Sequence, residues 1–365
     1  MYNTNNTNDI NNQNSTYTDN NYYTPTDNQN GFYQNNNYKP KPNKFIEILV
    51  ALAKSVGYIF IWLGVQLILT EAIAVVVAMQ NSTMNEDALM ELITNTIYQY
   101  SIELTVACNL IALGIYFLIF YIAKKSLIKK IDISIPDKRA FLPTFLVGFT
   151  GQFVTTLILG LLMNVLQVFP QEWIDALNQN GDMIDNANPA LSFFAVVILA
   201  PVFEEILCRG LILKTLNKTM NKWCAIVLSA SIFGIIHGNP IQFIYATALG
   251  ILLGWLYTKF DSILIPMLCH LAFNLVSQIA GYLDTENEAI AVLLALVMYV
   301  SIPIFIFSLV YFNITKFNKK ADTVSVNQPE IQYQIPISIP TQEYSRSTLQ
   351  ALEDEIEGKN KNNKE

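Results

Sequence analysis

Apolar residues along this chain are grouped in blocks of about 20 residues that are separated by polar stretches. A helix of about that length crosses the 30 Å hydrocarbon layer of a bilayer. In the first apolar block, residues 44–79, we expect the early part to lie at the membrane interface and the part from Gly57 onward to cross. Seven further blocks follow, at about 103–123, 141–169, 191–216, 222–237, 241–259, 262–283 and 289–313. The pattern therefore predicts an all-α membrane protein with about eight transmembrane helices.

Polar sequence at both ends divides the chain into three parts. Residues 1–43 are rich in Asn, Tyr, Thr and Gln, so they cannot bury enough aliphatic surface to order themselves, and a disordered tail is predicted. Residues 44–315 form the predicted polytopic membrane domain, and residues 316–365 form a polar cytoplasmic tail with one amphipathic candidate around Leu349, Leu352 and Ile356. We assign the C-terminal tail no catalytic role, and the sequence does not indicate the role of the Asn-rich N-terminal tail.

Charged residues between the blocks predict an orientation, because cytoplasmic loops are enriched in Lys and Arg. With eight spans, the lysine clusters all fall on one side: Lys39, Lys41 and Lys44; Lys124, Lys125, Lys129 and Lys130; Lys214, Lys218 and Lys222; Lys316, Lys319 and Lys320. Loops on the opposite side carry acidic residues: Glu86, Asp87, Glu91, Glu172, Asp175, Asp182, Asp185, Asp284, Glu286 and Glu288. Both termini are therefore predicted to be cytoplasmic, in what the Asn- and Lys-rich composition suggests is a bacterial plasma membrane.

Composition narrows the function further. The chain is 52% hydrophobic and 14% charged with a net charge of −7, and no basic stripe supports nucleic-acid binding. Its four cysteines each lie in an apolar block without close pairing, which predicts small buried hydrophobic residues rather than disulfides or a zinc ribbon: Cys108, Cys208, Cys224 and Cys269. The oligomeric state is not indicated by any of these features.

Three ionisable residues lie close together within the apolar block 191–216: Glu204, Glu205 and Arg209. Each would cost roughly 2.5–3.5 kcal/mol at the centre of a transmembrane helix. Glu205 and Arg209 are spaced i, i+4, which favours an ion pair on one face of the helix. Glu204 projects about 100° away from Glu205 and needs another partner or a function. The simpler alternative is that the trio only locks helices together.

The chain has two histidines, and both lie in apolar blocks. His237 follows Phe233 by one helical turn, and His270 precedes Asn274 by one turn, so His270 and Asn274 share a face. Gly238-Asn239-Pro240 should end the helix that carries His237. Such broken backbone is tolerated at membrane depth where protein or a water-filled cavity surrounds it.

A carboxylate, two imidazoles and an amide in one cavity could hydrolyse a peptide bond in two ways. In the first, a Glu acts as the base on a water molecule while His and Asn donate hydrogen bonds to the oxyanion. In the second, zinc binds Glu204, His237 and His270 with water in its open position. The sequence is equally compatible with zinc and with metal-free activation of water.

Three motifs at these positions resemble the CPBP family of intramembrane proteases, which includes the type II CAAX prenyl endopeptidases and proteins of bacteriocin processing and immunity. These are Glu204-Glu205-x-x-x-Arg209, Phe233-x-x-x-His237 and His270-x-x-x-Asn274, in order and in separate blocks over about 191–283. The resemblance implies that Glu204 and His237 activate water and that His270 and Asn274 stabilise the oxyanion. It also implies that Glu205 and Arg209 support the site.

The leading hypothesis is therefore an intramembrane endopeptidase, either a metalloendopeptidase or a glutamate-type protease, that acts on membrane-associated proteins or peptides. The alternatives are a non-catalytic regulatory or immunity protein with the same fold and, with less support, a transporter. The sequence does not identify the natural substrate or show whether it is prenylated. Gly250-x-x-x-Gly254 predicts close helix packing, with a dimer contact as the alternative.

Overall fold

The computed structural model describes residues 43–283 and 287–317. Contacts within the chain separate 1–43 from 44–365, and the fold described below belongs to the second unit. The predictions for both tails lie outside the described residues, as do the acidic residues Asp284 and Glu286. The part of the chain that the structure describes contains helices, turns and loops but no β-strand.

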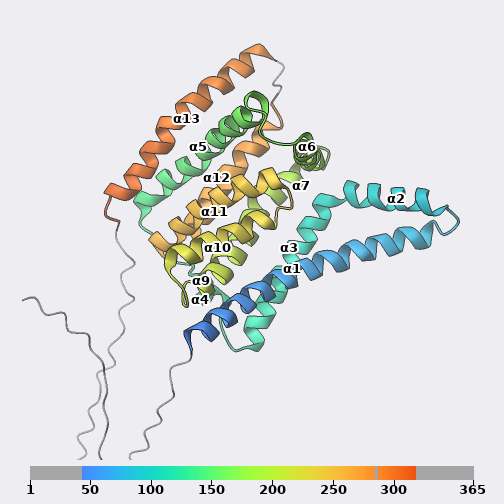
Figure 1. Ribbon diagram of the computed structural model, residues 1–365, viewed down its shortest axis with the longest axis horizontal. Coiled ribbons are helices and arrows are strands. Elements are labelled where there is room, and N and C mark those ends of the chain that lie inside the picture. The colour runs from blue at the N-terminus through green and yellow to red at the C-terminus, as the bar shows by residue number, and fades with distance from the viewer. Residues whose placement is uncertain (1–42, 284–286, 318–365) are drawn as a thin grey trace, which may run out of the picture. The chain divides into compact units, whose positions relative to one another are not determined.

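The part of the chain that the structure describes includes eight apolar helical segments, at the positions of the eight predicted blocks. Six are long enough to cross a membrane, namely Lys44–Gln80, Ser101–Ile122, Lys138–Val165, Pro189–Leu216, Pro240–Phe260 and Glu288–Ile314, and two are shorter, Lys222–Ile235 and Leu264–Ala280. Seven of them carry these labels: α1 (Lys44–Gln80), α3 (Ser101–Ile122), α5 (Phe141–Gly160), α10 (Lys222–Ile235), α11 (Pro240–Phe260), α12 (Leu264–Ala280) and α13 (Glu288–Ile314) (Figure 1). Helix α5 is flanked by a short 3-10 helix, η1 (Lys138–Ala140), and a short π-helix, η2 (Leu161–Val165). The eighth is the composite helix Pro189–Leu216. The predicted all-α multi-pass membrane fold is confirmed.

The composite helix Pro189–Leu216, called the motif helix below, carries the Glu-Glu-x-x-x-Arg sequence. It combines α-helical segments with two π-helical ones, in the order α7 (Pro189–Phe193), η3 (Phe194–Leu199), α8 (Ala200–Glu205), η4 (Ile206–Leu213) and α9 (Lys214–Leu216). Of its most apolar window, 56% is buried within the protein, against 6% for α1 and for α13. The motif helix is thus a central element, because π segments and buried charges both need surrounding protein to satisfy them.

Two of the expected acidic loops are helical, which corrects the sequence analysis. Helix α2 (Glu86–Gln99) begins at Asn85, whose side chain accepts a hydrogen bond from the backbone N of Ala88, and acidic residues in its first turn favour the helix N-terminus. Helix α6 (Gln171–Asp185) is amphipathic and lies beside α11. The first apolar block is also one continuous helix, α1, without a break between an interfacial and a crossing part.

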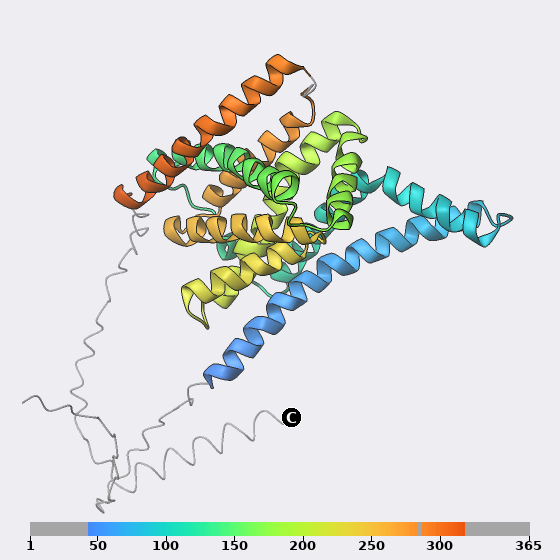
Figure 2. The ribbon, with the colours of Figure 1, turned by 45° about the horizontal axis from the view of Figure 1, so that its top comes forward.

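Small residues let the central helices approach closely, as Figure 1 and Figure 2 show for α10 beside α11 and for α5 between α12 and α13. A Cβ on Gly250 would lie 3.0 Å from the Cα of Ala230, and a Cβ on Gly148 would lie 2.0 Å from the carbonyl oxygen of Cys269. The predicted packing role of Gly250 and Gly254 is confirmed, and the contact is made within the chain.

Three of the four cysteines are buried among apolar side chains as predicted, namely Cys108, Cys208 and Cys269. Cys224 is exposed, which corrects that prediction, because it lies in the first turn of α10 where the helix leaves the core. All four thiols are free.

Candidate active site

A cavity of about 510 Å³ lies inside the helical bundle, and we call it the catalytic cavity. All four predicted catalytic residues line it, although they come from the motif helix, the end of α10 and α12: Glu204, His237, His270 and Asn274. Phe233, the aromatic residue of the second motif, also lines it. The three motifs, separated by up to 70 residues in the sequence, thus meet around one space.

The predicted ion pair between Glu205 and Arg209 is confirmed, and it lies beside the cavity in fully buried protein. Arg209 Nη1 donates to Glu205 Oε1 at 2.8 Å, and the two side chains are 1% and 0% exposed. Arg209 Nη2 donates to the carbonyl oxygen of Gly250 at 3.0 Å, and its guanidinium lies 4.7 Å from the centre of the Phe233 ring. Arg209 therefore connects the motif helix to α10 and α11 through a charge-assisted and a cation–π contact.

His270 links this buried pair to Glu204. Its Nδ1 lies 3.1 Å from Glu205 Oε1, and its Nε2 lies 3.6 Å from Glu204 Oε2. Because Glu205 Oε1 already accepts from Arg209, we assign Nδ1 of His270 as the nitrogen that donates to it. Nε2 is therefore the nitrogen that faces Glu204 and the cavity. Hydrogen bonds therefore run from Arg209 through Glu205 to His270, and Glu204 lies next to the far side of the imidazole.

His237 is held in the corresponding tautomer by the backbone. Its Nδ1 lies 2.7 Å from the carbonyl oxygen of Phe233, which can only accept, so Nδ1 donates and Nε2 carries the free lone pair. The predicted break after His237 is present: Gly238 has φ +73°, and Asn239 caps α11 while its amide donates to the carbonyl oxygen of Trp173. The break leaves His237 at the wall of the cavity, and the hydrogen bond from Asn239 to Trp173 joins this part of the backbone to α6.

Phe233 packs between the two histidines. Its ring lies edge-on to His237 at a centroid distance of 4.8 Å and to His270 at 5.6 Å. Its side chain is 1% exposed, so it is a rigid spacer that fixes the separation of the two imidazoles. The Phe of the Phe-x-x-x-His sequence thus contacts Arg209, His237 and His270 together.

Asn274 contributes an amide to the same cavity. Its Nδ2 donates to the carbonyl oxygen of Val196 at 2.9 Å, within the π-helical segment η3. One N–H is occupied by this bond, and the second N–H of the same amide remains for a ligand in the cavity. The π-helical segment therefore supplies the acceptor that orients Asn274.

The three residues predicted as zinc ligands, Glu204, His237 and His270, all line the catalytic cavity. Both histidines turn Nε2 toward the cavity and donate from Nδ1, as metal ligands commonly do. Among the described residues, however, no three His, Cys, Asp or Glu side chains come together as a group that could hold a metal ion. Glu204, His237 and His270 line one cavity, and zinc binding by these three residues stays a prediction.

Several residues that line the cavity were not predicted from the sequence. Gln152 comes from α5, Tyr245 from α11 and Asn180 from α6. Gln152 had a detectable signal, since it is a polar amide within an apolar block, and its buried Oε1 has no hydrogen-bond partner. Tyr245 had none, because an aromatic residue in an apolar helix is ordinary, and Asn180 was hidden in a segment interpreted as a loop.

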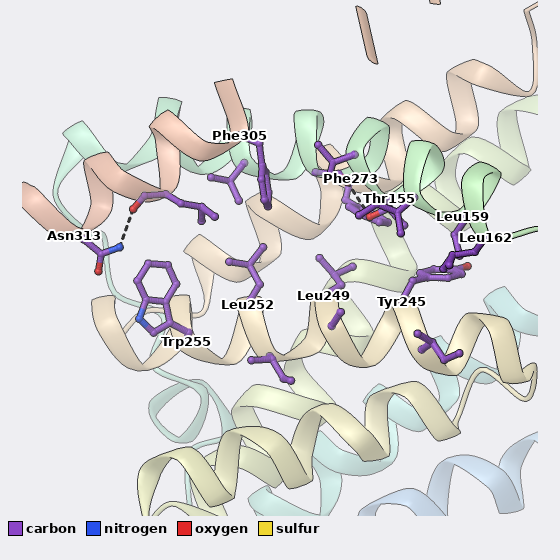
Figure 3. A pocket seen from close by; sticks show the side chains of 18 of the residues that line it. Thr155, Leu159, Leu162, Tyr245, Leu249, Leu252, Trp255, Phe273, Phe305 and Asn313 are labelled. Atoms are coloured by element: carbon purple, nitrogen blue, oxygen red, sulfur yellow. Dashed lines mark hydrogen bonds between the residues drawn. The ribbon is translucent and has the colours of Figure 1, made fainter. Parts of the chain in front are cut away.

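A second, apolar hollow adjoins the catalytic cavity between α5, α11 and α13, and we call it the apolar groove (Figure 3). Its volume is about 730 Å³. Five residues line both spaces: Thr155, Leu159, Tyr245, Leu249 and Phe273. From this shared wall the apolar groove extends past Leu252 to Trp255 and Asn313. The shared lining residues therefore form a continuous surface from the ionisable groups of the catalytic cavity to the apolar groove.

Comparison with known proteins finds similarities to the central region of the chain. The family described as type II CAAX prenyl endopeptidase Rce1-like matches residues 186–276, which include all three motifs. The chain is also 30% identical over 99 residues to a Bacillus subtilis (strain 168) protein named "Putative membrane peptidase YdiL". That similarity covers 27% of this chain and 41% of the length of the relative.

No solved structure matches the chain. The matched region begins just before the motif helix and ends within α12, so it contains every residue of the catalytic cavity that the three motifs supply. Residues 186–276 of this multi-pass membrane protein are therefore similar to the Rce1-like, type II CAAX prenyl endopeptidase family.

Proposed function

We propose that the protein is an intramembrane endopeptidase that hydrolyses a peptide bond in the catalytic cavity, with Glu204 as the general base. The observation that carries this proposal is the division of labour between two adjacent acids. Glu205 is committed to Arg209 and His270, whereas Glu204 keeps 19% of its side chain exposed toward a cavity that also holds His237 and Asn274. A carboxylate left in this setting is a functional candidate by default.

In the proposed reaction, Glu204 takes a proton from a water molecule while Nε2 of His237 accepts the second hydrogen bond and orients the nucleophile. The resulting hydroxide attacks the carbonyl carbon, and the carbonyl oxygen becomes an oxyanion. The free N–H of Asn274, together with Nε2–H of His270 when that nitrogen is protonated, would donate to this oxygen. When the C–N bond breaks, Glu204 returns its proton to the leaving amine nitrogen, which completes the balance of atoms.

The buried pair is proposed to hold His270 in place. Glu205 accepts from both Arg209 and Nδ1 of His270, so Arg209 fixes the carboxylate and the carboxylate in turn fixes the imidazole. Glu205 and Arg209 are positioning residues in this scheme because neither lines the catalytic cavity. Their expected contribution to catalysis is indirect.

We propose that the substrate is a membrane-associated protein or peptide with an apolar segment next to the bond that is cut. The apolar groove shares five lining residues with the catalytic cavity and would bind such a segment beside Glu204. Burial of apolar surface contributes roughly 25 cal/mol per Å², so even part of this groove could anchor a substrate. The relevant membrane is proposed to be a bacterial plasma membrane, with both termini cytoplasmic.

The test compares purified wild-type protein with Glu204→Gln and His237→Ala in cleavage of a library of membrane peptides. Loss of a general base typically lowers the rate by about 10²–10⁴-fold, so we expect cleavage by the wild type and little by either variant. Folding is checked by thermal unfolding of the same samples. A wild type that cuts nothing would favour a binding or immunity function, and variants that cut equally well would disprove the assigned roles.

A further inference from the structure

Four lysines gather where α1, α4 (Leu127–Ile131) and the C-terminal end of the motif helix meet. Lys54 lies on α1, Lys130 on α4, Lys214 on α9 and Lys218 in the following turn. These segments pack against one another: α1 contacts α9, and α4 contacts η4. The charges of the other three lysines all act on Lys130. We call these four residues the lysine cluster.

Asp132 is the carboxylate whose negative charge acts on Lys130, and one of its two oxygens is already engaged. Oδ2 of Asp132 accepts from Lys214 Nζ and, at 3.0 Å, from the hydroxyl of Tyr257. The backbone of Asp132 is left-handed, with φ +57°, and its carbonyl oxygen accepts from the backbone N of Ile263. Asp132 is therefore fixed beside Lys214, where its one negative charge opposes the positive charges of the four lysines.

Lys130 experiences this imbalance most strongly. Its Nζ donates to the hydroxyl of Thr215 at 3.1 Å, a neutral partner that does not offset its charge. Burial, followed by the positive charges of Lys218 and Lys214, lowers the pKa of Lys130 to about 8. An anion that bound beside Lys130 would reduce both the repulsion and the shift.

We propose that Lys54, Lys130 and Lys218 bind the phosphate group of an anionic ligand at this surface. Phosphate oxygens accept from several ammonium groups at once, which suits lysines that converge from three segments. The adjoining surface is apolar and exposed, with Ile128 on α4 54% exposed and Val50 on α1 44% exposed. A phospholipid would place its headgroup on the lysines and its acyl chains on this surface, while free phosphate would use the lysines alone.

The phosphate site would be coupled mechanically to the motif helix. A Cβ on Gly210 would lie only 2.6 Å from Cγ2 of Ile131, so α4 packs directly against the residue that follows Arg209. Thr215, the partner of Lys130, belongs to the same helix. An anion that orders Lys130 should therefore stabilise the base of the motif helix, whatever reaction occurs in the catalytic cavity.

The experiment uses the full-length protein in non-ionic detergent. Native mass spectrometry counts bound phosphatidylglycerol and, as the zwitterionic control, phosphatidylcholine with the same chains, while thermal unfolding reports the effect of inorganic phosphate. The test variant is Lys54→Gln/Lys218→Gln. The matched control is Lys125→Gln/Lys129→Gln, which removes two exposed lysines from the neighbouring sequence whose charges are not among those acting on Lys130.

We expect a defined first phosphatidylglycerol that the test variant binds about 25-fold more weakly, from about fivefold per lysine, and that the control variant binds within about threefold of wild type. Stabilisation by inorganic phosphate that is lost in the same variant would also support a phosphate site and would identify a free ion as the ligand. Equal losses in the two double variants would overturn the proposal, because they would indicate general surface charge. So would the absence of any effect of both anions. None of these outcomes depends on peptidase activity.

Discussion

Glu204 and Glu205 are neighbours in the sequence, yet the two faces of the motif helix give them opposite environments. The face of Glu205 is fully buried, and its carboxylate is held by Arg209 and His270. The face of Glu204 opens onto the catalytic cavity, with Nε2 of His270 3.6 Å from its carboxylate. The comparison teaches that position on the helix, rather than residue type, separates a group that stabilises the protein from one that is available for chemistry.

The two faces should therefore respond differently to mutation. Removal of one partner from a buried ion pair leaves an uncompensated charge, which is more costly than replacement of the pair by apolar residues. Removal of a group that faces a cavity leaves no such charge, because water can enter the space. Changes on the Glu205 face should lower stability, and changes on the Glu204 face should lower activity.

The largest expected effect on stability comes from Arg209→Met. This change leaves Glu205 buried without its cationic partner, with only His270 beside it, and should lower the free energy of unfolding by about 3–5 kcal/mol. Chemical unfolding in detergent micelles would measure it. The double variant Glu205→Leu/Arg209→Met removes both charges and should recover much of the loss. A double variant as unstable as Arg209→Met alone would contradict the role given to the uncompensated charge.

On the cavity face, Asn274→Ala should lower kcat by about 10²–10³-fold, because it removes one proposed oxyanion donor, worth about 2.7–4 kcal/mol in the transition state. The KM should change little, since the bond strengthens only as the oxyanion forms. Steady-state kinetics with a cleaved peptide would separate the two parameters. A rise in KM with unchanged kcat would instead make Asn274 a substrate-binding residue.

Much of the difference between the Glu204 face and the Glu205 face could be predicted from the sequence. The i, i+4 spacing of Glu205 and Arg209 predicts their ion pair, and Gly238-Asn239-Pro240 predicts the break after His237, because both depend on neighbours within one or two turns. The blocks of apolar residues likewise predict the helices that carry the motifs. Local spacing was sufficient wherever the determining contact was itself local.

Contacts between distant segments could not be predicted in the same way. That His270 is placed between Glu204 and Glu205 depends on how α12 packs against the motif helix, and no spacing in the sequence specifies this packing. The lining position of Tyr245 depends on the rotation of α11. Helix α6 was missed for a different reason: its many polar and acidic residues dominated the interpretation, although apolar residues spaced seven apart, Leu177 and Ile184, were present.

A smaller effect is expected in the apolar groove. Leu252→Trp should partly fill it and raise the KM about tenfold for peptides with a long apolar segment, which corresponds to about 1.4 kcal/mol of lost binding. Leu293→Trp, at a position on α13 that is 60% exposed and outside the apolar groove, is the matched control. If short polar peptides lose as much affinity as apolar ones, the groove does not bind the substrate segment.

Metal removal should have the smallest effect. Because the described acidic and histidine side chains do not gather into a metal-holding group, dialysis against a chelator should leave the cleavage rate within about twofold of its starting value. Elemental analysis of the same preparation would report bound zinc. Activity that is lost on dialysis and restored by stoichiometric zinc would contradict the metal-free scheme. It would instead support Glu204, His237 and His270 as zinc ligands.

The central claim is tested most directly by the same isosteric change at the two adjacent acids, with cleavage rate and unfolding midpoint measured on each preparation. We predict that Glu204→Gln lowers the cleavage rate by about 10²–10⁴-fold and leaves the midpoint close to that of wild type. Glu205→Gln should lower the midpoint markedly, because Arg209 loses its buried counter-charge. Full cleavage by Glu204→Gln, or the same loss of stability in both variants, would contradict the assignment of chemistry to one face and stability to the other.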